Sequence, residues 1–202
     1  MSLSIVTQPA VEPLSLAEAK AHLRVDHNDE DELIQIYIRA AREYLEGPYG
    51  FLGRCLVTQT WRLTLDEFPT AEIKIPLPPL QDVVKVAYDD SLGNEITINP
   101  DDYYVDSSSQ PGWVVPVSSW PTPLDAVNAV RIDFITGYPA DTGSSPPDLT
   151  ANIPFNIKAG MLLMIGNMYE NREDDIVGTI TAKLPHGAEF LFRPHRMQLA
   201  MA

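Results

Sequence analysis

LSLAEAKAHLRVD, residues 14–26, predicts the first helix of the chain. Ser15 and Glu18 have the spacing of a capping box, in which the serine hydroxyl accepts from an early backbone N–H and the glutamate reaches back to the cap. Alanine at positions 17, 19 and 21 favours helix strongly. We therefore expect a helix that starts at Ser15 and fades at Val25 and Asp26.

A second helix is predicted to follow at once. Asp29 is in position to cap it, and the acidic residues at 30–32 suit the positive end of a helix dipole. Apolar residues then recur at helical spacing, and Gly47-Pro48 stops the helix. The apolar positions are Leu33, Tyr37, Ala40, Ala41, Tyr44 and Leu45.

Between residues 56 and 138 the period of the apolar residues changes to two. Trp61, Leu63 and Leu65 alternate with polar residues, which is typical of a half-buried strand. Further short runs, separated by proline and glycine, lie at 73–75, 84–88, 95–98, 103–105, 113–115 and 130–135. Short, closely spaced strands favour an antiparallel β-domain, built as a sandwich or a small barrel.

A linker and a third helix follow the strands. Residues 142–147 have the composition of a linker, and Pro154 suits the first position of a helix that runs to Tyr169. This helix is apolar on nearly all sides, so it must be buried all round. We expect a neighbouring subunit to cover part of it, with Arg172 and its acidic neighbours paired across the boundary. The expected interface residues are Met161, Met164, Ile165, Met168, Tyr169, Arg172 and Glu173.

The end of the chain is basic, whereas the rest is acidic. Two arginines in the Arg193-Pro194-His195-Arg196 run neutralise few phosphates, so we favour docking on a partner protein over binding of DNA. Pro185 and Pro194 predict that residues 184–196 are extended or only briefly helical. The expected docking residues are Phe190, Leu191, Phe192, Arg193, His195 and Arg196.

These segments divide the chain into four parts. We expect an N-terminal helical part at 1–54, an antiparallel β-domain at 55–140, a linker at 141–153, and a C-terminal helix with a docking tail at 154–202. The fold class is therefore α+β.

The net charge of −14 is the clearest property of the composition. An acidic surface repels phosphate, so wrapping of DNA and binding to an anionic membrane are both disfavoured. The lone Cys55 excludes an internal disulfide, and neither a signal peptide nor a membrane-spanning segment is visible. We expect a soluble protein made in the cytoplasm.

No catalytic signature is present in the sequence. The acidic run at 26–32 fails the calcium-loop pattern, because position six is Asp31 and position twelve is Tyr37. The carboxylates near Glu170 and Glu173 predict a solvated helix end rather than an acid–base pair. We therefore expect neither an enzyme nor a cofactor or metal. A hydrolase that uses Asp174 and Asp175 ranks last among the alternatives.

Four blocks, in this order, resemble the head–tail connector (adaptor) proteins of long-tailed phages, prophages and gene transfer agents. They are residues 14–26, 169–173, 184–188 and 191–196. The resemblance implies that the terminal helices pack together, with the β-domain inserted between them. It also implies a structural virion protein at the head–tail junction, assembled in the host cytoplasm.

The resemblance also implies the partners of the protein. About a dozen copies would form a closed ring with heterologous contacts. One face of the ring would dock on the portal protein, the other would receive the stopper or tail terminator, and DNA would pass through the lumen without specific binding. The alternative is a carbohydrate-binding or adhesion module of a phage particle, with Trp113 and Trp120 as stacking platforms.

Overall fold

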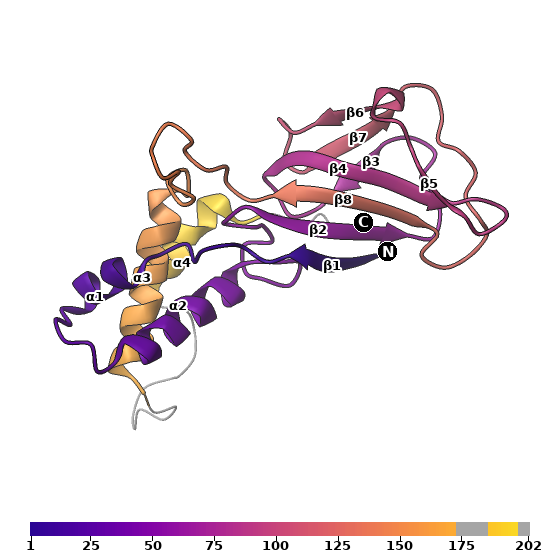
Figure 1. Cartoon of the computed structure of the whole chain (residues 1–202). Coiled ribbons are helices and arrows are strands. Elements are labelled where there is room, and N and C mark those ends of the chain that lie inside the picture. Colours follow the sequence, from indigo (N-terminus) through magenta and orange to yellow (C-terminus); the bar gives the residue numbers. More distant parts are fainter. Residues whose placement is uncertain (173–185, 198–202) are drawn as a thin grey trace. The chain divides into compact units, whose positions relative to one another are not determined.

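A computed structural model describes residues 1–172 and 186–197 of the chain (Figure 1). The fold is α+β, as predicted, and it divides into two compact units. Residues 1–10 and 57–139 form the β unit, and residues 11–56 and 140–202 form the helical unit. Residues 57–139 of the β unit are thus a long insertion within the helical part of the sequence, as the resemblance implied, whereas residues 1–10 precede that part.

Within the residues that the structure describes, the helical unit contains four α-helices, labelled in Figure 1. They are α1 (Leu16–Leu23), α2 (Asp31–Leu45), α3 (Phe155–Glu170) and α4 (His186–Phe192), followed by a 3-10 turn at Arg193–His195. α3 contacts each of the other three helices, so the N-terminal helix pair and the C-terminal helix pack together as expected. Their shared core includes Ile34, Ile38, Leu45, Ile157, Met161 and Phe192.

The ends of the helices follow from local chemistry. The capping box of α1 is present: Ser15 Oγ accepts from the Glu18 amide at 3.2 Å, and Glu18 Oε2 accepts from the Ser15 amide at 2.7 Å. The prediction for α2 was wrong by one residue, because Glu30 rather than Asp29 is the N-cap, without a side-chain cap bond. Pro154 is likewise the N-cap of α3 rather than its first helical residue.

Two antiparallel sheets form the β unit. The larger has the strand order β1-β2-β8-β4-β5, and the smaller has the order β3-β7-β6. Every strand expected from the sequence is present, within a few residues of its predicted limits. The bounds are β1 (Ser2–Thr7), β2 (Gln59–Leu65), β3 (Ile73–Ile75), β4 (Leu80–Asp89), β5 (Glu95–Thr97), β6 (Tyr103–Asp106), β7 (Gly112–Pro116) and β8 (Val130–Thr136).

The core of the β unit draws on both sheets. β8 has a regular alternation of buried and half-buried residues, which is typical of a sheet with one face in a core. The buried cluster combines residues of the larger sheet with Ile73, Ile75, Tyr103 and Val114 of the smaller one. Two sheets that share one core make a sandwich, so of the two expected forms the described strands take the sandwich and not the closed barrel.

One strand was missed from the sequence. Residues 2–7 were expected within an N-terminal helical part, but they form β1 and pair antiparallel with β2 along residues 60–64. Burial along β1 alternates only weakly, since it lies at the edge of the sheet and Leu3 and Ile5 are no more than half-buried. The strand signal was nevertheless present, because Ser2, Leu3, Ser4 and Ile5 alternate between polar and apolar, and it was overlooked.

Candidate interfaces of the helical unit

The apolar residues of α3 that were expected at a subunit boundary are largely enclosed by this chain. Met161 and Ile165 are 0% exposed and Met164 is 8% exposed, whereas Met168 is half-buried. They face α1, α2 and α4 because α3 is the central helix of the unit. Burial of these side chains is therefore achieved within one copy, and a partner is not required for it.

The C-terminal end of α3 is tied to the start of α2 by Glu30. Tyr169 donates its hydroxyl proton to this carboxylate, and Arg172 Nη2 lies 2.6 Å from Glu30 Oε1. The Arg172 guanidinium also lies over the Tyr169 ring, 4.9 Å from its centroid. The hydrogen bond from Tyr169, followed by that from Arg172, lowers the pKa of Glu30. Arg172 thus has an ion-pair partner within its own chain, and Glu173 lies outside the described residues.

The C-terminal docking residues lie in α4 and the following turn, which is briefly helical as predicted. Phe192 is 0% exposed and packs against α3 at Gly160, so it is not available to a partner in this conformation. Phe190 is 76% exposed, Leu191 is half-buried, and Arg193 is exposed. The outward side of this segment therefore carries Phe190 and Arg193.

The turn after α4 is also held on the helical unit. The Met197 amide donates to the Leu52 carbonyl at 2.9 Å, and the Arg196 guanidinium lies 4.8 Å from the centroid of Phe51. His195 is half-buried, and no described group pairs with its Nε2. Burial, followed by the charge of Arg54, lowers the pKa of His195. The segment 186–197 is a docked part of the unit rather than a free tail.

Two exposed ridges were not recognised from the sequence, and Ala40 and Tyr44, which were assigned to the apolar stripe of the second helix, are exposed. On α3, Phe155 is 84% exposed and Leu163 is 38% exposed, with the exposed Ala159 between them at steps of four residues. On α2, Ile36 is 62% exposed and Tyr44 is 48% exposed, with the exposed Ala40 between them. Both rows of residues at steps of four can be read in the sequence, but only packing tells which side of an apolar helix is exposed.

The two tryptophans proposed as stacking platforms differ in their contacts within the chain. Trp120 stacks on Phe68, with ring centroids 4.9 Å apart and planes 8° apart, and its Nε1 donates to the Ala71 carbonyl at 2.6 Å. One face of this ring is therefore occupied within the chain. Trp113 lies in β7 and is half-buried.

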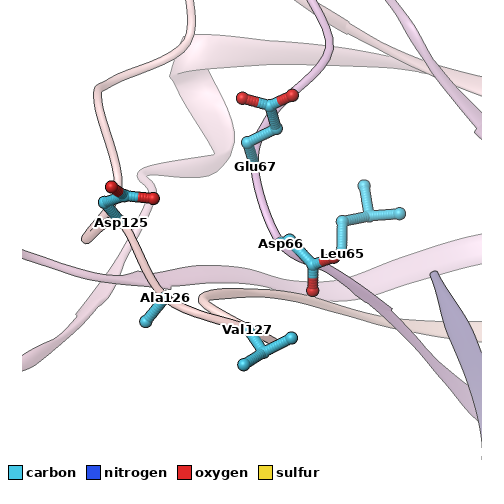
Figure 2. Close-up of a pocket in the computed structure, with 6 residues that line it drawn as sticks. All are labelled: Leu65, Asp66, Glu67, Asp125, Ala126 and Val127. Carbon is cyan, nitrogen blue, oxygen red and sulfur yellow. The ribbon is translucent and has the colours of Figure 1, made fainter.

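A shallow surface depression in the β unit lies between the segment after β2 and the segment before β8 (Figure 2). Figure 2 shows the carboxylates of Glu67 and Asp125 on these two facing segments. Asp66 Oδ1 accepts a hydrogen bond from the backbone amide of Asn128 at 2.9 Å, so this carboxylate stabilises the local turn. Within residues 1–172 and 186–197, no group of side chains could hold a metal ion, and no helix is long and apolar enough to span a membrane.

The chain folds as an α+β protein of two units. Its candidate interaction sites are exposed helix surfaces of the helical unit. Residues 13–101 match the family described as phage gp6-like head-tail connector protein. The expected resemblance to head–tail connector proteins is confirmed. Comparison with curated protein sequences gives no match.

Solved structures match nearly the whole chain. The neck of an empty gene transfer agent particle, computed with C6 symmetry, matches with a TM-score of 0.76 and 22% identity, over 97% of this chain and 95% of that one. The virion of a native gene transfer agent particle matches with the same values. The neck of the native particle, computed with C12 symmetry, has a TM-score of 0.73 and 23% identity over the same shares. The α+β fold of this chain is therefore shared with a chain present in these gene transfer agent particles.

Proposed function

We propose that this chain is a structural head–tail connector of a phage-like virion, without catalytic activity. The match of its whole fold to a gene transfer agent neck protein carries this proposal. The family match over residues 13–101 supports it independently, because it comes from sequence alone. The functional surfaces are then faces that join copies and partners, rather than a reaction centre.

In this function the chain forms a closed ring at the head–tail junction. The neck structures of the fold relatives were computed with C6 and C12 symmetry, which supports a ring for a chain of the same fold. One face of the ring binds the portal protein, and the opposite face binds the stopper or tail terminator. The ring assembles in the host cytoplasm and then becomes part of the virion.

The docking element on the portal side is the C-terminal segment. Of its expected residues, Phe190 and Arg193 are exposed on α4 and the following turn, and Arg196 is exposed beside Phe51. An exposed aromatic residue flanked by arginines has the composition of a protein-binding anchor. Phe192 holds the segment to the helical unit from the inside.

The genome passes through the lumen of the ring without specific binding. With a net charge of −14, the chain as a whole repels the phosphates of DNA. DNA that does not adhere to the wall can move during packaging and ejection. The low affinity is thus a requirement of the proposed function.

Deletion of the gene in the host that encodes it tests this proposal. We expect electron microscopy of the lysate to show heads and tails that remain separate, and expression of the wild-type chain to restore joined particles. Tailed particles of normal appearance from the deletion strain would contradict a connector function. Antibody labelling of wild-type particles should mark the head–tail junction.

A further inference from the structure

Two exposed helix ridges of the helical unit share one pattern. The α3 ridge consists of Phe155, Ala159 and Leu163, and the α2 ridge consists of Ile36, Ala40 and Tyr44. In both, a large apolar residue is followed by alanine and by a second large apolar residue at steps of four. Such rows are the ridges that interlock when two helices pack, and the small central residue lets the helices approach closely.

The two ridges lie on opposite sides of the packed pair α2 and α3. On α3, Phe155 and Leu163 are exposed, and the helix buries Ile157, Met161 and Met164 on its other side. On α2, Ile36 and Tyr44 are exposed, and the buried residues Ile34 and Ile38 face the core. α2 and α3 contact each other, and each ridge lies on its helix opposite that helix's buried residues, so the ridges point away from each other.

Surfaces on opposite sides of a subunit are what a head-to-tail contact requires. In a heterologous interface, one patch of a copy meets a different patch of the next copy, and the series closes into a ring when the rotation permits. A single ridge could make only an isologous pair with itself. Two matching ridges that point in opposite directions can link each copy to two neighbours.

The charges also favour a second copy as the occupant. Two chains of net charge −14 repel less when at least one of the two faces through which they meet lacks negative charge. The exposed positions of α3 from Phe155 to Asn167 are uncharged, and Lys158, which contacts Thr150, lies beside them. The α2 ridge is flanked by Gln35 and Arg39, with 68% of the Arg39 side chain exposed, and by the exposed acids Glu32 and Glu43. Negative charge is therefore present beside the α2 ridge and absent from the exposed positions of the α3 ridge.

We propose that the Phe155–Ala159–Leu163 ridge of one copy packs across the Ile36–Ala40–Tyr44 ridge of the next copy. This inference rests on the proposed ring and names the surface that builds it. It differs from the interface expected from the sequence, because Met161, Met164 and Ile165 lie on the buried side of α3. Ala159 and Ala40 then lie at the crossing point, where the two helix backbones are closest.

Cysteine cross-linking of the purified full-length chain tests the contact. The variants are Ala40→Cys, Ala159→Cys and the double variant, and the wild-type chain with its buried Cys55 is the blank. Under mild oxidation we expect the double variant to give a ladder of dimers, trimers and higher species. An equal mixture of the two single variants should give dimers only, and each single variant alone should give none.

A matched pair controls for chance collisions. Ala159→Cys combined with Val127→Cys, in the β unit at a residue that is 78% exposed, should give no ladder. Dimers from either single variant alone would mean an isologous contact and would overturn the inference. A ladder from the control pair equal to that of the double variant would overturn it as well.

Negative-stain electron microscopy of the same samples separates this inference from the proposed function. Rings without a ladder from the double variant overturn the ridge contact and leave the ring intact. If the wild-type chain gives no rings and the double variant gives no ladder, the ring itself fails and the ridge contact fails with it. As a second readout, Ala159→Leu should reduce ring formation about tenfold or more without lowering the melting temperature, because leucine is tolerated on an exposed helix face.

Discussion

The ring of Phe192 in α4 lies directly against the backbone of α3 at Gly160. A Cβ added at Gly160 would stand 2.4 Å from Cε1 of this ring, a distance at which one of the two must move. Phe192 is 0% exposed, so the contact is sealed from water. The absence of a side chain at one position therefore allows the C-terminal segment to dock on the helical unit.

Gly160→Ala should loosen this docking. Alanine favours an α-helix over glycine by about 1 kcal/mol, but forcing a methyl group into a packed contact costs roughly 1–3 kcal/mol. We expect a net loss of stability and faster cleavage within residues 186–197 by a protease at native conditions. Limited proteolysis followed by mass spectrometry measures the effect.

A matched glycine controls for helix propensity. A Cβ at Gly187 would lie 3.4 Å from Leu163 Cδ1, an ordinary contact, so Gly187→Ala should leave docking unchanged or slightly stronger. Phe192→Leu in the Gly160→Ala background should recover part of the lost protection, since the two sites couple. Equal protease sensitivity of Gly160→Ala and wild type would show that the contact does not hold the segment.

Two neighbouring residues of α3 should behave in opposite ways. Met164→Glu places a carboxylate in the helical core and should cost roughly 3 kcal/mol or more of unfolding free energy. Leu163→Glu changes a residue that is 38% exposed and should leave the unfolding free energy within about 1 kcal/mol, while it abolishes self-association. Urea unfolding and analytical ultracentrifugation separate the two effects. Similar losses of stability in both variants would place Leu163 in the core instead.

Features of the fold that depend on residues close together in the sequence could be predicted, whereas features that depend on contacts between distant residues could not. The capping box at Ser15 and the seven strand segments are local patterns, and all were predicted. β1 was overlooked although Ser2 to Ile5 alternate between polar and apolar, because the strand has only six residues and precedes two predicted helices. The side of α3 that faces out could not be predicted, because an apolar helix has no polar face to mark it. The exposed side of α3 is determined by the packing of Phe192 on Gly160 and by contacts with the other helices, which are distant in sequence.

Acidification should weaken the contact between α2 and α3 at Glu30. The pKa of this carboxyl lies below its ordinary value of 4.5, because Tyr169 and then Arg172 stabilise the charged form. A group with a lowered pKa in the folded state contributes stability above its unfolded pKa, and this contribution is lost as the pH falls through the folded pKa. We therefore expect it to be complete at pH 7 and lost progressively below about pH 4.5.

Glu30→Gln isolates this contribution. The variant should lose stability at pH 7 relative to wild type, and the difference should be smaller at pH 3, since the stabilisation by the charged carboxylate is lost as the pH falls through its lowered pKa. Glu32→Gln, which changes an exposed acid in the first turn of the same helix, is the control and should show no such convergence. Urea unfolding at both pH values gives the comparison, and a constant difference between wild type and Glu30→Gln would contradict it.

The acidic chain should not bind duplex DNA at physiological salt. With 28 acidic and 14 basic residues, it lacks the cations that would release counterions from the DNA backbone. Fluorescence anisotropy with a labelled duplex should show no change up to high protein concentration. A salt-sensitive rise in anisotropy at low micromolar protein would remove the electrostatic argument for free passage through the lumen.

Docking on the portal should depend on the exposed side of α4. The combination of Phe190→Ser and Arg193→Ala removes an apolar anchor that is 76% exposed and a nearby cation, and neither change touches the buried Phe192. Loss of an interface anchor of this kind typically costs 1–3 kcal/mol, which is roughly a ten- to hundredfold loss of affinity. Truncation from Pro185 onward should abolish binding altogether and leave the β unit folded, but it also uncovers Gly160, so the point variants are the sharper test.

The measurement is co-sedimentation of each variant with purified portal rings. Tyr49→Ser, at a residue of the helical unit that is 99% exposed and far in sequence from α4, is the matched control and should bind as wild type does. Circular dichroism should show the same helix content in all three proteins, so that a loss of binding is not a loss of fold. Wild-type affinity in the Phe190→Ser/Arg193→Ala variant would assign docking to another surface, and the acidic stretch at the start of α2 would be the next to test.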